Sequence, residues 1–278
     1  MEKFFSQEVD DNMKYLESID FSHFDSSLIT NMKSIFDKCS SLKSINFSNF
    51  NVSSVIDMSG MFSNCISLKS INITNFNTLS VVDIHEIFNN CSSLESINDL
   101  FDLDTSKVTD MSNMFNGCRL KSFDLTSFNT YSVTNMSGIF NNCNYLELIN
   151  ISNFNTLNID DMSYMFSNCY SLKSIDLSEF NTSLVNNMKA MFYNCSSLLS
   201  INISNFNTGS VIDMSEIFSN CISLKFIDLS NFNTFSVIDM NRMFSNCKSL
   251  ESIFGLFNFE TSKVNNIYLK IEKILLYN

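Results

Sequence analysis

The stretch "NNMKAMFYNCSSLLSINISNFNTGSVIDMSEIFSNC", from Asn186 to Cys221, contains its own beginning again near its end. Its first 13 residues, "NNMKAMFYNCSSL", return 26 positions later as "IDMSEIFSNCISL". The same period runs along the chain in ten leucines: Leu16, Leu42, Leu68, Leu94, Leu120, Leu146, Leu172, Leu198, Leu224 and Leu250. A period of about 20 to 50 residues is typical of solenoids and propellers, whose repeats bury their apolar side against one another. The sequence therefore predicts a stack of ten repeats.

Each repeat changes its apolar period once. Ile175 and Leu177 alternate with polar residues, which is the pattern of a strand with one buried face. Helical spacing then follows at Val185, Met188, Met191, Phe192 and Cys195. We therefore expect one strand and one short helix in each repeat, with the repeated leucines and phenylalanines filling the interior.

The ends of this predicted helix carry their own signals. The residue before each methionine position is always Asp or Asn, the residues that a helix N-cap prefers: Asn31, Asp57, Asp83, Asp110, Asn135, Asp161, Asn187, Asp213, Asp239 and Asn266. The residue before each cysteine is mostly Asn, with Gly117 in one repeat and Lys38 in the first. Asn and Gly tolerate the left-handed conformation that ends a helix. These signals predict a helix of about two turns per repeat.

The order L-x-x-I-x-L, then M-F-x-N-C-x-S-L, resembles the BspA-like leucine-rich-repeat family of surface proteins over residues 16–264. It is more closely similar to the 26-residue "LDLSNFDTSNVTDMSxMFxxC" repeats of bacterial surface lipoproteins. The resemblance implies an α/β solenoid, a right-handed stack of strand and short-helix repeats with a parallel sheet. It also implies a non-enzymatic role in adhesion or host interaction.

The ends of such a stack need polar covers. We expect residues 1–15 to form an acidic N-terminal cap and residues 16–264 to form the solenoid. Residues 265–278 ("NNIYLKIEKILLYN") lack the cysteine motif and predict a closing amphipathic helix, with Ile267, Ile271, Ile274 and Leu275 on one face. A membrane-surface role for this segment is the less favoured interpretation.

The charge and hydropathy of the sequence argue against several classes of protein and of partner. The net charge is −12 and the 17 Lys and Arg look scattered, so we expect no nucleic-acid partner. No stretch approaches the roughly 18 apolar residues of a membrane span. The opening "MEKFFSQEVDDN" lacks the apolar core of a signal peptide. The resemblance places the chain at the cell surface or outside the cell, and this opening keeps a cytoplasmic location open.

The sequence shows no arrangement of residues typical of a catalytic or metal-binding site. The nine cysteines recur at one repeat position without C-x-x-C spacing, and the two histidines, His23 and His85, are far apart in the sequence. A zinc site needs four converging ligands, and nucleophilic catalysis needs a base beside the nucleophile. We therefore expect buried thiols, no cofactor, no metal and no enzyme activity. Neighbouring cysteines of the stack bridging as disulfides is the alternative.

The outward strand positions form the candidate binding face. Most are Ser, Thr, Asp or Asn, and such uniform columns favour a broad binding face over a small-molecule pocket. Large apolar residues interrupt them, and exposed aromatic residues are typical interface anchors. The candidate partner-binding residues on this face are Leu148, Asn150, Asp176, Asn202, Phe226, Asp228 and Phe254. For Phe226 and Phe254 the alternative is packing under the C-terminal cap.

A second candidate patch is formed by Tyr131 and Leu157, at the variable position after the repeated threonine. The sequence thus predicts a monomeric protein-binding solenoid whose partner is another protein. Two alternatives stay open. One is an intracellular interaction scaffold. The other is glycan or ordered-water binding by an outward ladder of Thr130, Thr156, Thr182, Thr208 and Thr234.

Overall fold

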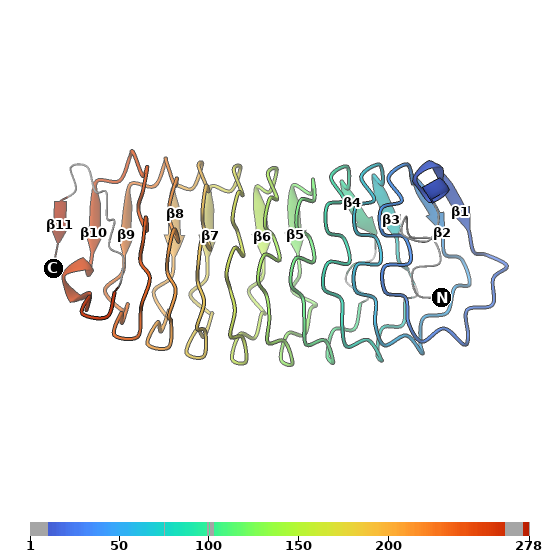
Figure 1. Ribbon diagram of the computed structural model, residues 1–278, viewed down its shortest axis with the longest axis horizontal. Helices are drawn as coiled ribbons and strands as arrows, with labels where there is room; N and C mark the ends of the chain where they lie inside the picture. Colours follow the sequence, from blue (N-terminus) through green and yellow to red (C-terminus); the bar gives the residue numbers. More distant parts are fainter. Residues whose placement is uncertain (1–10, 75, 99, 101–102, 265–274, 278) are drawn as a thin grey trace.

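The chain winds into one elongated stack of similar turns, with β1 and β10 at opposite ends (Figure 1). The computed structural model describes residues 11–74, 76–98, 100, 103–264 and 275–277. Ten three-residue strands recur along it: β1 (Ser18–Asp20), β2 (Ser44–Asn46), β3 (Ser70–Asn72), β4 (Ser96–Asn98), β5 (Ser122–Asp124), β6 (Leu148–Asn150), β7 (Ser174–Asp176), β8 (Ser200–Asn202), β9 (Phe226–Asp228) and β10 (Ser252–Phe254). The predicted repeat stack is therefore confirmed.

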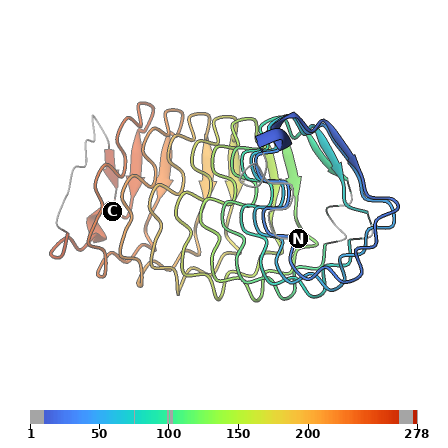
Figure 2. The ribbon, with the colours of Figure 1, turned by 45° about the vertical axis from the view of Figure 1, so that its right-hand side comes forward.

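The strands pair in parallel, each residue opposite its equivalent in the next repeat, as in Ile175 opposite Ile201. The hydrogen-bonded pairs are β1–β2, β3–β4, β5–β6 and β7–β8, while β9 and β10 join a third strand, β11 (Leu275–Tyr277). Successive turns lie side by side along the whole stack (Figure 2). The predicted parallel sheet is thus present, but within the described residues it is divided into small sheets of two or three strands.

The predicted short helix is wrong. The part of the chain that the structure describes holds no α-helix, only short 3-10 pieces such as η1 (Asp11–Tyr15) and η3 (Leu256–Asn258). Each tail segment, which we define as the run from the Asp or Asn to the Cys (161–169 in one repeat), contains two left-handed residues instead. In these segments the positive φ values lie between 51° and 73°. A left-handed residue four positions before another cannot continue a right-handed helix.

The backbone hydrogen bonds of a tail segment explain its shape. The N–H groups of Met162, Tyr164, Phe166 and Asn168 donate to carbonyls of the next repeat, at 2.7–3.0 Å. The intervening N–H groups stay local, as in Met165 to Met162 O at 3.3 Å. A helix would place all of these bonds within one segment. The alternating conformation therefore ties successive repeats together.

The Asp or Asn that opens each tail segment keeps part of its predicted role. Asp161 Oδ1 accepts the backbone N–H of Ser163 at 2.7 Å, and equivalent bonds recur along the stack. These residues also form a continuous parallel ladder of bridges from Asn31 to Asp239. The side chains therefore cap a turn within a ladder rather than a helix. The predicted left-handed residue before each cysteine is confirmed, including Lys38 at φ 63°.

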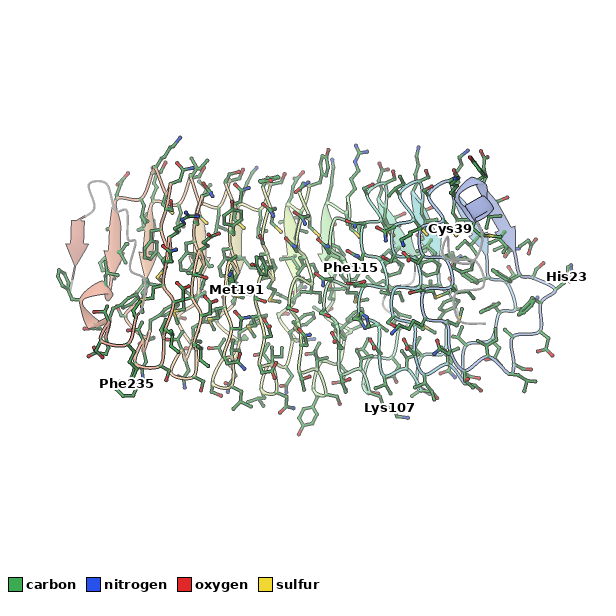
Figure 3. The ribbon with its side chains drawn as sticks, viewed as in Figure 1. His23, Cys39, Lys107, Phe115, Met191 and Phe235 are labelled. Atoms are coloured by element: carbon green, nitrogen blue, oxygen red, sulfur yellow. The ribbon has the colours of Figure 1, made fainter. Side chains whose placement is uncertain are left out.

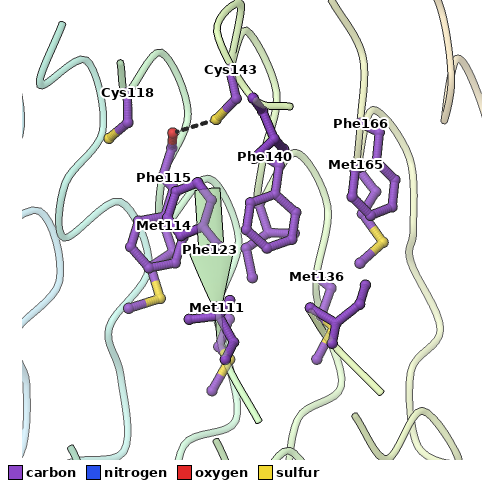
Figure 4. Close-up of a cluster of buried hydrophobic side chains, with 14 of the residues drawn as sticks. Met111, Met114, Phe115, Cys118, Phe123, Met136, Phe140, Cys143, Met165 and Phe166 are labelled. Atoms are coloured by element: carbon purple, nitrogen blue, oxygen red, sulfur yellow. Dashed lines mark hydrogen bonds between the residues drawn. The ribbon is translucent and has the colours of Figure 1, made fainter. Parts of the chain in front are cut away.

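The interior is filled as the sequence predicts. Phe115, Phe140 and Phe166 lie one after another along the stack (Figure 4). They belong to a stacked column from Phe36 to Phe244 with ring centroids 5.4–6.0 Å apart. Offset parallel rings at this distance attract one another in addition to burying apolar area. Because the same ring recurs in every repeat, the column keeps the turns equally thick and keeps the strand faces of successive repeats aligned.

The two predicted caps lie largely outside the described residues. Of the N-terminal cap, η1 precedes the first turn. Of the predicted closing helix, residues 265–274 and 278 lie outside the described part, and Leu275–Tyr277 form strand β11 against β10.

Candidate interaction surface

The first and third residues of each strand point outward, away from a central residue that is buried or half-buried. In β7, Ser174 and Asp176 are exposed and Ile175 is buried. The first position is Ser in eight of the ten strands from β1 to β10, and the third is Asp or Asn in nine. The strands therefore present a face of hydroxyl, amide and carboxylate groups running along the stack.

The predicted polar residues of this face are exposed and also shape the turn that follows each strand. Asp176 Oδ1 accepts the backbone N–H of Ser178 at 2.9 Å, and this bond is the main cause of its lowered pKa. The same i+2 bond is made by Asn150 (3.4 Å), Asn202 (3.3 Å) and Asp228 (2.9 Å). The side-chain oxygens of these four residues are hydrogen-bond acceptors on the exposed face.

The apolar residues that replace the usual polar residues on this face are exposed. Leu148 is 70% exposed, Phe226 56% and Phe254 37%. Phe226 stands opposite Ser252 and Phe254 opposite Asp228, so the two rings lie diagonally on adjoining strands of one face. Diagonal neighbours of this kind are within reach of a single bound aromatic or aliphatic group. The structure therefore brings Phe226 and Phe254 together and leaves Leu148 on β6.

Tyr131 and Leu157 lie on a different edge of the stack, in the loops after the repeated threonine, and are 62% and 46% exposed. Asn158 Nδ2 donates to the carbonyl oxygen of Tyr131 at 2.7 Å and joins the two loops. Phe235 and Lys107 belong to the same loops of other repeats and mark this edge in Figure 3. The two predicted patches are therefore separate surfaces.

The predicted outward threonine ladder is wrong. Thr130, Thr156, Thr182, Thr208 and Thr234 are buried. Thr182 Oγ1 donates to Asn207 O at 2.9 Å and accepts the Asn207 N–H at 2.8 Å, and the other four make equivalent bonds. Both hydrogen-bonding roles of each hydroxyl are used inside the protein. Glycan or ordered-water binding by this ladder is therefore not proposed.

Two asparagine columns hold turns together. Asn129, Asn155, Asn181, Asn207 and Asn233 each accept the i+2 backbone N–H of their own turn. The asparagines before the cysteines form an amide ladder that the sequence analysis missed, as in Asn194 Nδ2 to Asn168 Oδ1 at 2.9 Å. Where Gly117 interrupts it, the neighbouring Asn116 completes the ladder to Asn142 at 3.0 Å.

The cysteines form a buried column of thiols, as predicted. Cys65 and the seven cysteines after it each donate Sγ–H to a phenylalanine carbonyl of the preceding repeat, at 3.0–3.2 Å. Burial raises the pKa of Cys143 to about 12. A thiol that stays protonated is a poor nucleophile and a poor metal ligand. Among the described residues no group of three or more His, Cys, Asp or Glu is arranged to hold a metal ion.

The sequence analysis also missed exposed residues on the edge between the cysteine and the strand. Tyr145 is 48% exposed, Tyr170 39% and Leu199 51%. Their repeat positions hold Ser, Asn, Lys or Glu in most other turns. Their departure from the residues that recur at these positions is the signal by which the sequence marks them.

The chain belongs to the family described as "Mycoplasma protein of unknown function, DUF285", whose model matches residues 1–102, 95–195 and 170–275. The resemblance to BspA-like leucine-rich-repeat proteins agrees with this match and with the observed stack. No curated protein sequence matches the chain.

The chain is similar to several solved structures. A leucine-rich repeat protein from Bacteroides ovatus ATCC 8483 is 19% identical, with a TM-score of 0.40, over 72% of this chain and 58% of that one. One from Eubacterium ventriosum ATCC 27560 is 17% identical, with a TM-score of 0.40, over 96% and 82%. A leucine rich cell surface protein from Faecalibacterium prausnitzii A2-165 is 18% identical, with a TM-score of 0.28, over 86% and 76%. The chain thus spans less than two thirds of the Bacteroides protein.

In the part of the chain that the structure describes, no helix has the length and apolar character that crossing a bilayer requires.

Proposed function

We propose that this chain is a non-enzymatic protein-binding module that uses its outward strand face. The observation that supports this most directly is the pair Phe226 and Phe254, two exposed rings on adjoining strands amid hydroxyl and carboxylate groups. Apolar anchors surrounded by polar groups are the usual composition of a protein interface. Asn150, Asp176, Asn202 and Asp228 supply the polar surroundings, and Leu148 a third apolar anchor.

Among the described residues, one interior cavity is too small for a compact ligand. A cavity of about 10 Å³ lies beside Leu103, with Phe76 and Phe88 in its lining. That volume accommodates about one water molecule. A shallow face along the stack is a better match to a folded or extended protein partner than to a compact ligand.

The test is a binding screen of the whole chain against arrayed proteins, followed by the double variant Phe226→Ser/Phe254→Ser. A partner of the strand face should lose at least about tenfold in affinity, because the double change removes two apolar anchors. Phe235→Ser is the matched control, since Phe235 is 58% exposed but lies on the loop edge. Equal binding by all three chains, with unchanged thermal unfolding, would contradict the proposal.

The resemblance supports placing this module at the cell surface, in an adhesion or host-interaction role. The buried column of thiols favours the second candidate, an intracellular interaction scaffold, because free cysteines persist in reducing compartments. Protease treatment of intact source cells distinguishes the two. Release of peptides from this chain, with cytosolic markers intact, supports the surface role. Protection until lysis supports the scaffold.

A further inference from the structure

The basic residues, which look scattered in the sequence, gather on one long edge of the stack. We call this the basic edge, formed by the residues between each cysteine position and the first strand residue. It carries eight Lys or Arg and four Glu, while the other described residues carry six Lys or Arg and nineteen Asp or Glu. Its cations are Lys14, Lys43, Lys69, Arg119, Lys121, Lys173, Lys225 and Lys248. A positive edge on a strongly negative protein attracts acidic partners to that edge.

Along the basic edge the charges come in pairs set by the strand pairing. A backbone hydrogen bond joins Lys43 to Glu17, Glu95 to Lys69, Glu147 to Lys121 and Glu251 to Lys225, so each of these repeat pairs carries one Lys and one Glu. The remaining pair joins Lys173 to Leu199, at 2.8 Å. Lys173 is therefore paired with Leu199 at the position where every other lysine of these pairs faces a glutamate.

Exposed apolar side chains gather where this glutamate is missing. Tyr145, Leu148, Tyr170 and Leu199 lie in the sixth to eighth repeats and are all at least 39% exposed. Together with Lys173 we call them the central patch. Aromatic residues beside a cation are the composition of an interface anchor rather than of an ordinary solvated edge.

Three side-chain contacts hold the tyrosines of the central patch in place. The Arg119 guanidinium lies over the Tyr145 ring, 5.1 Å from its centroid. The Tyr170 hydroxyl lies 3.4 Å from Asn168 Oδ1 and accepts from Asn194 Nδ2 at 3.2 Å. Rings fixed before binding lose less conformational freedom when a partner arrives.

We propose that the central patch binds an extended acidic segment of a partner protein, with a carboxylate at Lys173 and apolar side chains against Tyr145, Leu148, Tyr170 and Leu199. This rests on the proposed function and names the chemistry of the partner. The glutamates between the lysines argue against a polyphosphate or other uniform polyanion, whose charges would fall opposite Glu95, Glu147 and Glu251. A polypeptide can place carboxylates opposite the lysines and neutral residues opposite the glutamates.

The experiment is selection of a random 12-residue peptide library, displayed on phage, against the immobilised full chain. Enriched peptides are then synthesised and their dissociation constants measured by fluorescence anisotropy at low and high salt. We expect enriched peptides to place Asp or Glu beside aromatic or aliphatic residues. Lys173→Glu and Tyr170→Ser should each weaken binding about tenfold or more, and added salt should weaken it further.

Matched controls lie on the loop edge. Lys107→Glu reverses another exposed lysine, and Tyr131→Ser removes a tyrosine that is 62% exposed. Neither should change peptide binding, and all four variants should unfold at the temperature of the parent chain. Peptides without acidic enrichment, no enrichment at all, or equal binding to Lys173→Glu would each overturn the proposal. Labelled polyphosphate that binds the parent chain and is lost in Lys173→Glu, without any acidic peptide, would instead indicate a polyanion site.

The same variants distinguish the proposal for the central patch from the proposed function of the strand face. Peptides or proteins that lose affinity only in Phe226→Ser/Phe254→Ser would leave the strand-face function standing and overturn the central patch as the binding site. Loss only in Lys173→Glu and Tyr170→Ser would support the central patch and move the binding site away from Phe226 and Phe254.

Discussion

The thiol of Cys143 donates a hydrogen bond to the carbonyl oxygen of Phe115, one repeat earlier, at 3.1 Å (Figure 4). The bond joins two neighbouring turns inside the core, where Cys143 is fully buried. Its repetition in the next repeats explains why cysteine recurs at this position. The side chain is small enough to pack between turns and still provides a weak donor to a carbonyl that water does not reach.

The thiols should therefore be inert in the native protein. Burial raises the pKa of Cys247 to about 12, yet Cys247 alone among the nine is partly accessible. At pH 8 a thiol of that pKa is ionised about one part in ten thousand, so alkylation should be slow. We expect iodoacetamide to label Cys247 first and the other cysteines only on unfolding, as read by mass spectrometry. Rapid native labelling of Cys143 would contradict the buried column.

The left-handed conformation in the tail segments predicts which of two substitutions gives the more stable protein. Tyr164 has φ 57°, a left-handed value. Gly adopts this conformation more easily than Ala by about 1 kcal/mol, whereas in a helix Ala is favoured over Gly by a similar amount. Denaturant unfolding of Tyr164→Gly and Tyr164→Ala should therefore show the Gly variant to be more stable. The opposite order would indicate the helix that the sequence predicted.

The reverse change at an equivalent position provides an independent check. Gly138 has φ 60°, and a Cβ there would collide with the side chain of Asn113 in the preceding repeat. Gly138→Ala should lower the free energy of unfolding by at least about 1 kcal/mol. A neutral effect would show that this turn relaxes easily.

The buried threonines should act on stability alone. Thr182→Val keeps the shape but removes both hydrogen bonds to Asn207, leaving a backbone N–H and a carbonyl without the partner they have now. We expect a loss of about 1–3 kcal/mol for the pair of groups. Thr182→Ser retains the hydroxyl and should lose less. If Val and Ser variants unfold alike, the hydroxyl contributes little and the methyl packing dominates.

His85 should make stability depend on pH. Its Nδ1 lies 2.7 Å from Asp83 Oδ1, and this hydrogen bond, more than the nearby charges of Asp83, Asp110 and Glu86, raises the pKa of His85 above its usual 6.5 against the effect of burial. A raised histidine pKa gives stability that is fully present below about pH 6.5 and is lost as pH rises through the folded value. The parent chain should therefore exceed His85→Gln in stability more at pH 5.5 than at pH 8.5.

The pKa of Asp83 sets the lower end of the pH range over which this ion pair stabilises the fold. Burial acts to raise its pKa, but the hydrogen bonds from the His85 side chain and backbone N–H outweigh burial and leave the pKa lowered. A lowered carboxyl pKa gives stability above about pH 3.8 that disappears as pH falls through the folded value. The stability difference between the two chains should thus also shrink near pH 3. A difference independent of pH would contradict the ion pair.

The sequence predicted the stack and its interior because these depend on a repeated apolar pattern. Leu172, Phe192 and Cys195 are buried by the same rule that makes them recur. The short helix was wrong because apolar spacing cannot distinguish a helix from successive turns that bury the same residues. The discriminating signal was Gly60 and Gly138 in the middle of the predicted helix, where glycine disfavours a helix but suits a left-handed residue.

The binding surfaces were predicted in part. The exposure of Phe226 follows from its outward strand position, which the alternation of β9 defines. Tyr145, Tyr170 and Leu199 depart from their repeat positions in the sequence itself, whereas the pairing of Lys173 with a residue other than glutamate becomes apparent only once β7 is placed against β8. Burial of the threonines was missed because a hydroxyl at a loop position looks solvated until the neighbouring turn is placed against it.

The division of the strands into pairs has a mechanical consequence. The bridges from Asn31 to Asp239 run without a break, whereas the described sheets do not join β2 to β3, β4 to β5, β6 to β7 or β8 to β9. One side of the molecule is therefore a continuous ladder of bridges, and the strand side is divided into units of two repeats, about 52 residues each. Bending should concentrate where neighbouring strands are not hydrogen-bonded to each other. A partner bound across β6 and β7 would span such a position and stiffen it.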